Sequence, residues 1–202
     1  MSADAPTLAT GLHPDTRTAS GTAVGGATLW FTGLPSAGKS TIAHALADRL
    51  IAAGVRVQVL DGDAVRPHLS AGLGFSRSDR DLNVTRIGWV ARLLASHGVT
   101  VLVPVIAPYA AARQAVRAAH GEAGVPFAEV FVSTSLAVAE SRDVKGLYAK
   151  ARLGEITGLT GVDDPYEEPR SAELVLDTAE VDLATSVELA SALLTAIQED
   201  QP

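Results

Sequence analysis

The sequence carries a complete phosphate-binding loop signature, G-x-x-x-x-G-K-S, from Gly33 to Ser40. An apolar run at 27–31 precedes it and is typical of a buried strand, and a helical pattern at 41–53 follows it. A loop in this position wraps a polyphosphate with its backbone N–H groups, and the helix dipole favours the negative charge. Lys39 is expected to reach the β- and γ-phosphates, and the Ser40 hydroxyl is expected to bind Mg²⁺. The chain is therefore predicted to bind a nucleoside triphosphate.

Length and composition fit one α/β domain. The chain has 202 residues, of which 47% are hydrophobic, enough for a single buried core. A net charge of −7 argues against a general nucleic-acid surface. No apolar run reaches the ~18 residues of a membrane span, so no membrane association is expected. The absence of cysteine excludes disulfides and thiolate zinc sites, and it is compatible with a cytoplasmic location.

The beginning of the chain differs in composition from the rest. Residues 1–26 are rich in Ala, Thr, Gly and Ser and lack the basic start and apolar core of a secretory signal. We expect a mobile N-terminal arm at 1–26 and one folded domain at 27–202.

Strand-like and helix-like segments alternate from residue 27 onward. Continuous apolar runs, typical of buried parallel strands, lie at 28–32, 55–60, 100–105, 127–132 and 173–176. Helical patterns lie at 41–53, 79–97, 109–119, 135–141 and 186–198, and Ser78 with Asp81 is expected to form a capping box. This alternation predicts a three-layer α/β fold with a doubly wound parallel sheet, the P-loop nucleoside triphosphate hydrolase/kinase fold. Ligands of such sheets bind beyond the carboxyl ends of the strands.

Charged residues follow the second predicted strand. Asp61 and Asp63 come directly after it, and Arg66 lies one helical turn further on. A carboxylate here can hold Mg²⁺ through water or accept a proton from an acceptor hydroxyl. A guanidinium matches the oxygens of phosphate or sulfate. A helix cap with a surface ion pair is the alternative for this group.

A glycine-rich loop with several arginines comes next. Phe75 lies in a polar stretch, where an aromatic ring either stacks on a base or plugs the core. Arg80 and Asn83 lie one helical turn apart, so both can face the same ligand. In an acidic protein, at the ligand-binding edge of the sheet, we interpret this cluster as an anion site.

Two later segments are candidates for a cover over the site. The segment 142–152 is densely basic and has a glycine at its centre, and 157–167 is rich in turn residues. We expect a lid around 142–168 that closes over phosphates and excludes water. An exposed basic helix is the alternative for its first half.

Together these motifs resemble the adenosine-5′-phosphosulfate (APS) kinase family over residues 24–178. The matching blocks, in order, are GLPSAGKST, LDGDAVR, GLGFSRSDRDLNV, VIAPY, RDVKGLYAKAR and TGVDDPYE. The resemblance implies transfer of the γ-phosphoryl group of ATP to the 3′-hydroxyl of APS, giving 3′-phosphoadenosine-5′-phosphosulfate (PAPS) and ADP. It also implies Mg²⁺ as cofactor and a homodimer.

The resemblance further implies a role for individual residues. Asp63 would orient or deprotonate the 3′-hydroxyl, with Lys39 and Asp61 as the other catalytic residues and with Ser40 and Asp61 at the metal. The ATP side would comprise Gly33, Ser36, Ala37, Gly38, Lys39, Ser40, Thr41, Arg142 and Arg152. The APS side would comprise Asp63, Arg66, Phe75, Arg80, Asn83, Ile106, Ala107, Lys145, Gly158 and Leu159.

Three positions depart from the family pattern. Ala107 stands where some members have a serine proposed to carry phosphate, so direct in-line transfer is the simpler hypothesis here. Thr85 replaces one of a pair of arginines, and Leu159 stands where many members have a phenylalanine that closes on the adenine. A weaker acceptor KM, rather than loss of activity, is the expected consequence.

Other readings of the sequence stay open. They are a P-loop kinase for another small hydroxyl acceptor, a sulfonucleotide-binding protein without turnover and, least favoured because no Asn-Lys-x-Asp element occurs, a GTPase. The segments outside the matching blocks are short, so we expect the chain to depend on a separate ATP sulfurylase for APS.

Overall fold

The computed structural model describes residues 25–200, so most of the predicted arm at 1–26 lies outside the described residues. The fold is built on one parallel sheet of five strands in the order β2-β3-β1-β4-β5. The strands are β1 (Ala27–Thr32), β2 (Val57–Val59), β3 (Thr100–Pro104), β4 (Phe127–Val132) and β5 (Leu174–Leu176). This confirms the predicted α/β class and the doubly wound parallel sheet.

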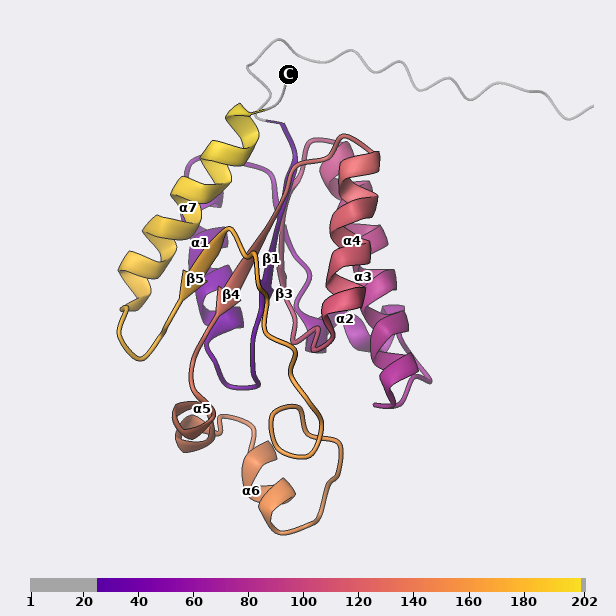
Figure 1. The fold of residues 1–202 in the computed structure, drawn as a ribbon. Coiled ribbons are helices and arrows are strands. Elements are labelled where there is room, and N and C mark those ends of the chain that lie inside the picture. Colours follow the sequence, from indigo (N-terminus) through magenta and orange to yellow (C-terminus); the bar gives the residue numbers. More distant parts are fainter. Residues whose placement is uncertain (1–24, 201–202) are drawn as a thin grey trace, which may run out of the picture.

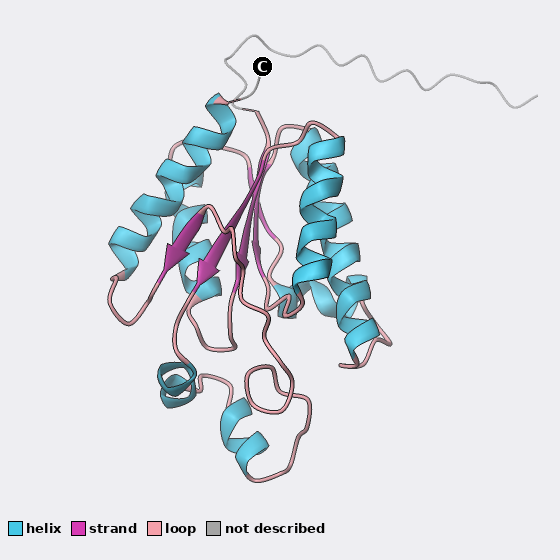
Figure 2. Cartoon of the chain, viewed as in Figure 1, coloured by secondary structure: helices cyan, strands magenta, loops and turns pink. Residues whose placement is uncertain are grey.

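Helices cover both faces of the sheet and complete three layers (Figures 1 and 2). On one face α1 (Lys39–Ala52) packs beside α7 (Leu183–Glu199), and on the other α3 (Arg77–Ser96) packs beside α4 (Ala110–Glu122). Each face has its own apolar core, with Leu29 and Phe31 of β1 on the α1/α7 side and Trp30 on the α3/α4 side. The alternation of side chains along a strand places these neighbours on opposite faces.

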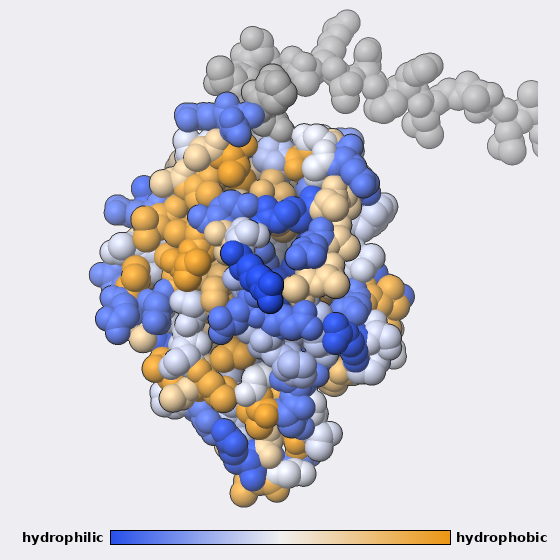
Figure 3. Space-filling model, viewed as in Figure 1, coloured by the Kyte–Doolittle hydropathy of each residue, from blue (hydrophilic) through white to orange (hydrophobic). Residues whose placement is uncertain are grey.

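The central and edge strands differ in burial, as their positions require. Every residue of β1 is buried, because β1 has a parallel neighbour on each side and helices above and below. The edge strands β2 and β5 have three residues each, and short edges limit unwanted pairing with other chains. Val175 of β5 and Leu183 and Leu189 of α7 are exposed, and Figure 3 shows hydrophobic residues gathered over these elements.

Several predicted boundaries need correction. The stretch after β2 is a helix, α2 (Gly62–Leu69), which was not predicted. The cap of α3 is Ser76, whose hydroxyl accepts the N–H of Asp79, rather than Ser78 with Asp81. The sequence holds the same Ser-x-x-Asp spacing at both places, and the chain uses the earlier one. The predicted strand at 55–60 shrinks to β2.

The region expected to form a lid, 142–168, lies beyond the carboxyl ends of the strands. It begins at the last residue of α5 (Leu136–Arg142) and contains one short helix, α6 (Leu147–Arg152), followed by a long loop (Figure 1). The two ends of the described chain lie at the opposite end of the sheet, where the Gln198 side chain donates to the Gly25 carbonyl at 2.7 Å. Within residues 25–200, no helix has the length and apolar character needed to span a membrane.

Candidate active site

A cavity of about 600 Å³ lies at the carboxyl ends of β1, β2 and β3 and is the centre of the candidate site. It is bounded by the phosphate-binding loop, the start of α2, the loop before α3, the segment after β3, the turn before α6 and the loop before α7. Sequence-predicted residues among those lining it are Ser36, Gly38, Lys39, Ser40, Thr41, Asp61, Asp63, Arg66, Phe75, Arg80, Asn83, Ile106, Ala107, Arg142 and Lys145.

The phosphate-binding loop has the backbone that its glycines permit. Gly33 has φ 149°, and a β-carbon there would lie 2.4 Å from the Val132 carbonyl oxygen, so no larger residue fits. Lys39 folds back over the loop, and its Nζ donates to the carbonyls of Gly33 at 2.9 Å and Leu34 at 2.7 Å. Burial lowers the pKa of Lys39 to about 7, against the opposing attraction of Asp61 and Asp63. The Lys39 ammonium lies inside the loop, where the oxygens of a bound polyphosphate would accept hydrogen bonds from it.

Ser40 and Asp61 form an oxygen-rich corner beside the loop. The Ser40 hydroxyl donates to Asp61 Oδ2 at 2.5 Å, and Asp61 Oδ1 accepts the N–H of Asp63 as the cap of α2. Hydroxyl and carboxylate oxygens suit Mg²⁺, which is usually held by few protein ligands and completed by phosphate and water. Among the described residues no group of three or more acidic, His or Cys side chains is placed to hold a metal ion alone. The corner thus fits a cation that arrives with a nucleotide.

Asp63 lies opposite the basic turn that joins α5 to α6. Its carboxylate is paired with the ammonium of Lys145, and both side chains are more than half exposed. Gly146 adopts φ 66°, a left-handed conformation at the N-cap of α6 that suits glycine. Asp143 accepts the N–H groups of Tyr148 and Ala149 and fixes the same turn from its other side. This end of the expected lid therefore reaches the α2 carboxylate directly.

The far wall of the cavity combines an aromatic ring with two guanidinium groups. Phe75 is 65% exposed, so its ring is presented at the surface of the site rather than used as a core plug. The Arg66 guanidinium lies over the ring at 4.3 Å and that of Arg80 at 5.6 Å, both within cation–π range. Arg66 donates to the carbonyls of Leu73 and Gly74, and Arg80 donates to Phe75 and to the Thr160 hydroxyl.

Asn83 supplies an unused acceptor to this wall. Its Oδ1 is buried and has no hydrogen-bond partner, although it belongs to a side chain that lines the cavity. A buried polar atom without a partner is costly, which indicates a place for a donor on a bound molecule. Ile106 and Ala107 line the same side, and Ala107 adopts φ 43°, which is uncommon for a residue with a β-carbon.

Arg142 ties the expected lid to the phosphate-binding loop. Its guanidinium donates to the hydroxyl and the carbonyl of Thr178, at 2.7 and 2.8 Å, and the Thr178 hydroxyl donates to Ala37 O at 2.9 Å. Sequence reasoning missed the loop before α7, which contributes Thr178, Val181 and Asp182 to the cavity, and the first residue of α7, Leu183. The signal that points to this loop is its position after the fifth strand, since ligands of such sheets bind beyond the carboxyl ends of the strands.

Some predicted residues lie outside the cavity lining. Arg152 forms an ion pair with Glu140 at 2.8 Å, and Gly33 and Ala37 form the buried inner part of the phosphate-binding loop. Leu159 is 8% exposed and packs with Ala139 and Tyr148. The carbonyl of Gly158 accepts from Arg80, which links this loop to the wall described above. Their proposed ligand contacts stay predictions.

A strand–loop–helix with the phosphate-binding loop signature, an oxygen-rich corner beside it and a wall with two guanidinium groups meet in one cavity, an arrangement typical of P-loop kinases. The sequence model of the adenylylsulphate kinase family matches residues 25–177. The chain belongs to this family.

Individual relatives and solved structures agree with the family match. The chain is 56% identical over 164 residues to an adenylyl-sulfate kinase of Synechococcus sp. (strain JA-3-3Ab), covering 81% of this chain and 91% of that protein. It is 58% identical over 154 residues to an adenylyl-sulfate kinase of Deinococcus deserti, covering 76% and 82%. The structure is similar to the Mycobacterium tuberculosis APS kinase CysC in complex with AMPPNP and APS, with a TM-score of 0.80 and 46% identity over 83% of this chain and 97% of that one.

Proposed function

We propose that this chain performs the reaction of its family, transfer of the γ-phosphoryl group of ATP to the 3′-hydroxyl of APS, which gives PAPS and ADP. The observation that carries the proposal is that one cavity holds both a phosphate-binding loop and a separate wall of two arginines around an exposed aromatic ring. A nucleotide donor and a sulfonucleotide acceptor need such a pair of sites. The solved relative bound to AMPPNP and APS supports the same assignment.

On the donor side, the loop and Lys39 hold the phosphates of ATP. Ser40 and Asp61 would hold Mg²⁺ that arrives with the nucleotide, and the cation would supply neutralisation of the charge on the transferred group. Thr178 and Arg142 place the loop before α7 and the expected lid against Ala37, so the nucleotide is enclosed from the α7 side. Enclosure excludes water, which would otherwise compete as the acceptor.

On the acceptor side, Arg66 and Arg80 hold the phosphosulfate, and Phe75 stacks on the adenine. Guanidinium groups match the planar arrangement of two oxygens on phosphate and sulfate. Asp63 accepts the proton of the 3′-hydroxyl or aligns it for attack, and Lys145 moves from Asp63 to the incoming anion. Positioning and charge, rather than covalent chemistry, provide most of the acceleration in such reactions.

The experiment that tests the function measures ADP release from Mg·ATP with APS, with AMP, adenosine and shikimate as control acceptors and with mass identification of the product. APS-dependent ADP release with PAPS formed is the expected result. Turnover with a control acceptor instead would redirect the assignment to another hydroxyl acceptor. Binding of APS without turnover would identify a sulfonucleotide-binding relative.

Three wider assignments go with this function. The chain is proposed to act as a homodimer, as the family resemblance implies. We also propose that a separate ATP sulfurylase supplies APS, because the family model that matches residues 25–177 is that of the kinase. We propose a cytoplasmic location, which the need for ATP supports. Sedimentation at several concentrations measures the first of these assignments.

A further inference from the structure

The wall that faces the acceptor is held by a residue outside the cavity. Ala107, on the segment that leaves β3, lines the cavity with φ 43°. Its carbonyl accepts Nη1 of Arg113 at 2.7 Å, and Arg113 is 3% exposed on α4. Because the left-handed conformation is unfavourable for a residue with a β-carbon, the surrounding structure must impose it. The Arg113 hydrogen bond is one contact that does so.

The same guanidinium also holds the loop that carries the end of the expected lid. Nη2 of Arg113 donates to the carbonyl of Glu167 at 2.6 Å. The N–H of Glu167 donates to Pro108 O at 2.8 Å, and the Glu167 carboxylate accepts the N–H of Ala110 at 2.8 Å. Arg113 therefore joins two chain segments, at Ala107 and Glu167, that are about 60 residues apart in the sequence, and both border the acceptor side.

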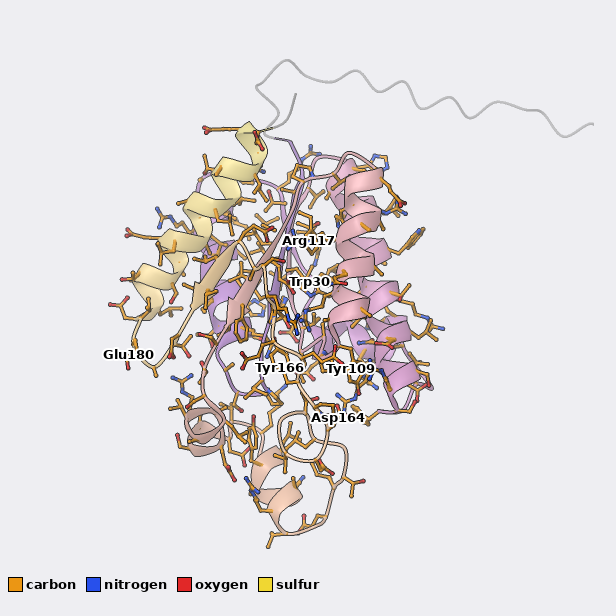
Figure 4. All side chains as sticks on the ribbon, in the orientation of Figure 1. Trp30, Tyr109, Arg117, Asp164, Tyr166 and Glu180 are labelled. Atoms are coloured by element: carbon orange, nitrogen blue, oxygen red, sulfur yellow. The ribbon has the colours of Figure 1, made fainter. Side chains whose placement is uncertain are left out.

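This junction continues to a residue of the acceptor wall. The Tyr109 hydroxyl donates to Asp164 at 2.9 Å, and Asp164 lies 3.9 Å from Arg80. Figure 4 shows Tyr109, Asp164 and Tyr166 close together below the sheet, whereas Arg117 lies further up α4. On the β1 side, Thr32 donates to the Ile106 carbonyl at 2.6 Å and shares a hydrogen bond with the Tyr166 hydroxyl at 2.9 Å.

Arg113 is itself oriented by a buried carboxylate. Its Nε lies 2.7 Å from Glu129 Oε1, with both side chains almost fully buried, although the N–H is not directed closely enough at the oxygen to form a regular hydrogen bond. A buried ion pair gains little stability over apolar residues of the same volume. What an apolar residue would lack is the fixed fork of donors that reaches two carbonyls at once.

We propose that Arg113, oriented by Glu129, is a positioning residue that shapes the acceptor subsite by fixing the Ala107 and Glu167 carbonyls. This inference rests on the function proposed above and deepens it. Arg113 contacts no residue of the phosphate-binding loop in the described structure, so its effect belongs to the acceptor and not to ATP. A residue that only stabilised the fold would alter both substrates alike.

The test compares KM for APS and for ATP in the wild type and three variants. Arg113→Lys keeps the positive charge but loses the planar guanidinium that donates to two carbonyls at once. The double variant Arg113→Met with Glu129→Gln serves if the single change impairs folding, because it removes both members of the ion pair and leaves no unpaired charge between them. Arg117→Met is the matched control. Arg117 lies on α4 like Arg113 and pairs with Glu129 and Glu173, but it does not donate to the carbonyls of Ala107 or Glu167. Near-ultraviolet circular dichroism checks that each variant is folded.

We expect KM for APS to rise at least about tenfold in both Arg113 variants, because hydrogen bonds from a charged group to the two carbonyls are lost. KM for ATP should stay within about twofold of the wild-type value. Arg117→Met should behave like the wild type. A parallel rise in both constants, or no change in either, would overturn the positioning role. Calorimetric titration of the wild type with APS separates the two proposals. A wild type that neither binds nor phosphorylates APS fails at the proposed function and removes the basis of this inference with it.

Discussion

At the residue scale, Lys39 combines burial with a binding role. Its ammonium hydrogen-bonds to two carbonyls of its own loop, and burial lowers its pKa to about 7. Below pH 7 the free side chain is charged, and above it the side chain is mostly neutral. A bound polyphosphate stabilises the charged form and raises this pKa, so binding above pH 7 takes up a proton.

We therefore predict that AMPPNP affinity falls as pH rises from 7 to 9, approaching about tenfold per pH unit. Calorimetric titrations at pH 8 in two buffers of different ionisation enthalpy measure the proton uptake directly. Lys39→Arg is the control, since its guanidinium stays charged and removes the uptake. Equal binding enthalpies in the two buffers for the wild type would contradict the prediction.

A second prediction concerns Asp63, whose carboxylate lies in the first turn of α2 and pairs with Lys145. Asp63→Asn should lower kcat by about 10²–10⁴ because the amide cannot accept the hydroxyl proton. ATP binding should stay close to that of the wild type, since Asp63 contacts no atom of the phosphate-binding loop through a hydrogen bond in the described structure. Steady-state kinetics with a parallel nucleotide titration tests both halves, and a near-normal kcat would remove Asp63 from the proton transfer.

At the element scale, the packing of α3 on α4 depends on one glycine. A β-carbon at Gly88 of α3 would lie 2.6 Å from a methyl group of Val116 on α4, and valine has little freedom to move aside. Gly88→Ala should therefore lower the free energy of unfolding by about 1–3 kcal/mol. Gly121→Ala on α4 is the matched control, because nothing lies within 4 Å of its β-carbon. It should be neutral or stabilising by up to about 0.5 kcal/mol through helix propensity.

Urea unfolding curves of the two variants and the wild type measure these differences. Equal destabilisation by both alanines would show that the helix contact is not the cause. The comparison is informative because the residue change is identical and the surroundings alone differ.

Elements with a strong period were predictable from the sequence, and short ones were not. The buried strands β1, β3 and β4 read as continuous apolar runs, and α1, α3 and α7 carry long helical patterns. In contrast, α2 has eight residues, begins at a glycine and contains Pro67, so no propensity signal marks it. Its helical form depends on the Asp61 cap, a local signal that the sequence analysis holds as an alternative, and on packing against α3, which is a tertiary effect.

The candidate site shows the same division. Recognisable motifs in the sequence predict Lys39, Asp63 and Phe75 as site residues, and all three line the cavity. Thr178 and Arg113 were missed because their role is created by topology. One closes the cavity from a loop of ordinary residues, and the other acts from beneath it through backbone carbonyls.

At the scale of the whole molecule, charge is distributed unevenly. The chain carries a net charge of −7, yet its cavity is lined by Lys39, Arg66, Arg80, Arg142 and Lys145. A cationic cleft in an acidic protein draws anionic substrates toward itself and away from the rest of the surface. Salt weakens this attraction, because the screening length falls from about 10 Å at 0.1 M to about 3 Å at 1 M.

We predict that KM for both APS and ATP rises as NaCl is increased from 0.05 to 0.5 M, while kcat changes much less. Initial rates at fixed Mg²⁺ measure the effect, and an uncharged osmolyte at matched osmolarity is the control. Salt-independent KM values would show that local hydrogen bonds, rather than the field of the cleft, govern capture of the substrates.

The contact between Gln198 and Gly25 has a topological consequence. Because these residues touch at the end of the sheet remote from the cavity, a few added residues would join them into a closed ring. The ring can then be cut at 121–124, where the end of α4 and the turn that follows it are exposed. A chain rearranged in this way keeps the same strand neighbours and the same cleft while its new ends lie between α4 and β4. The order in which the segments are synthesised is thus separable from the architecture they form.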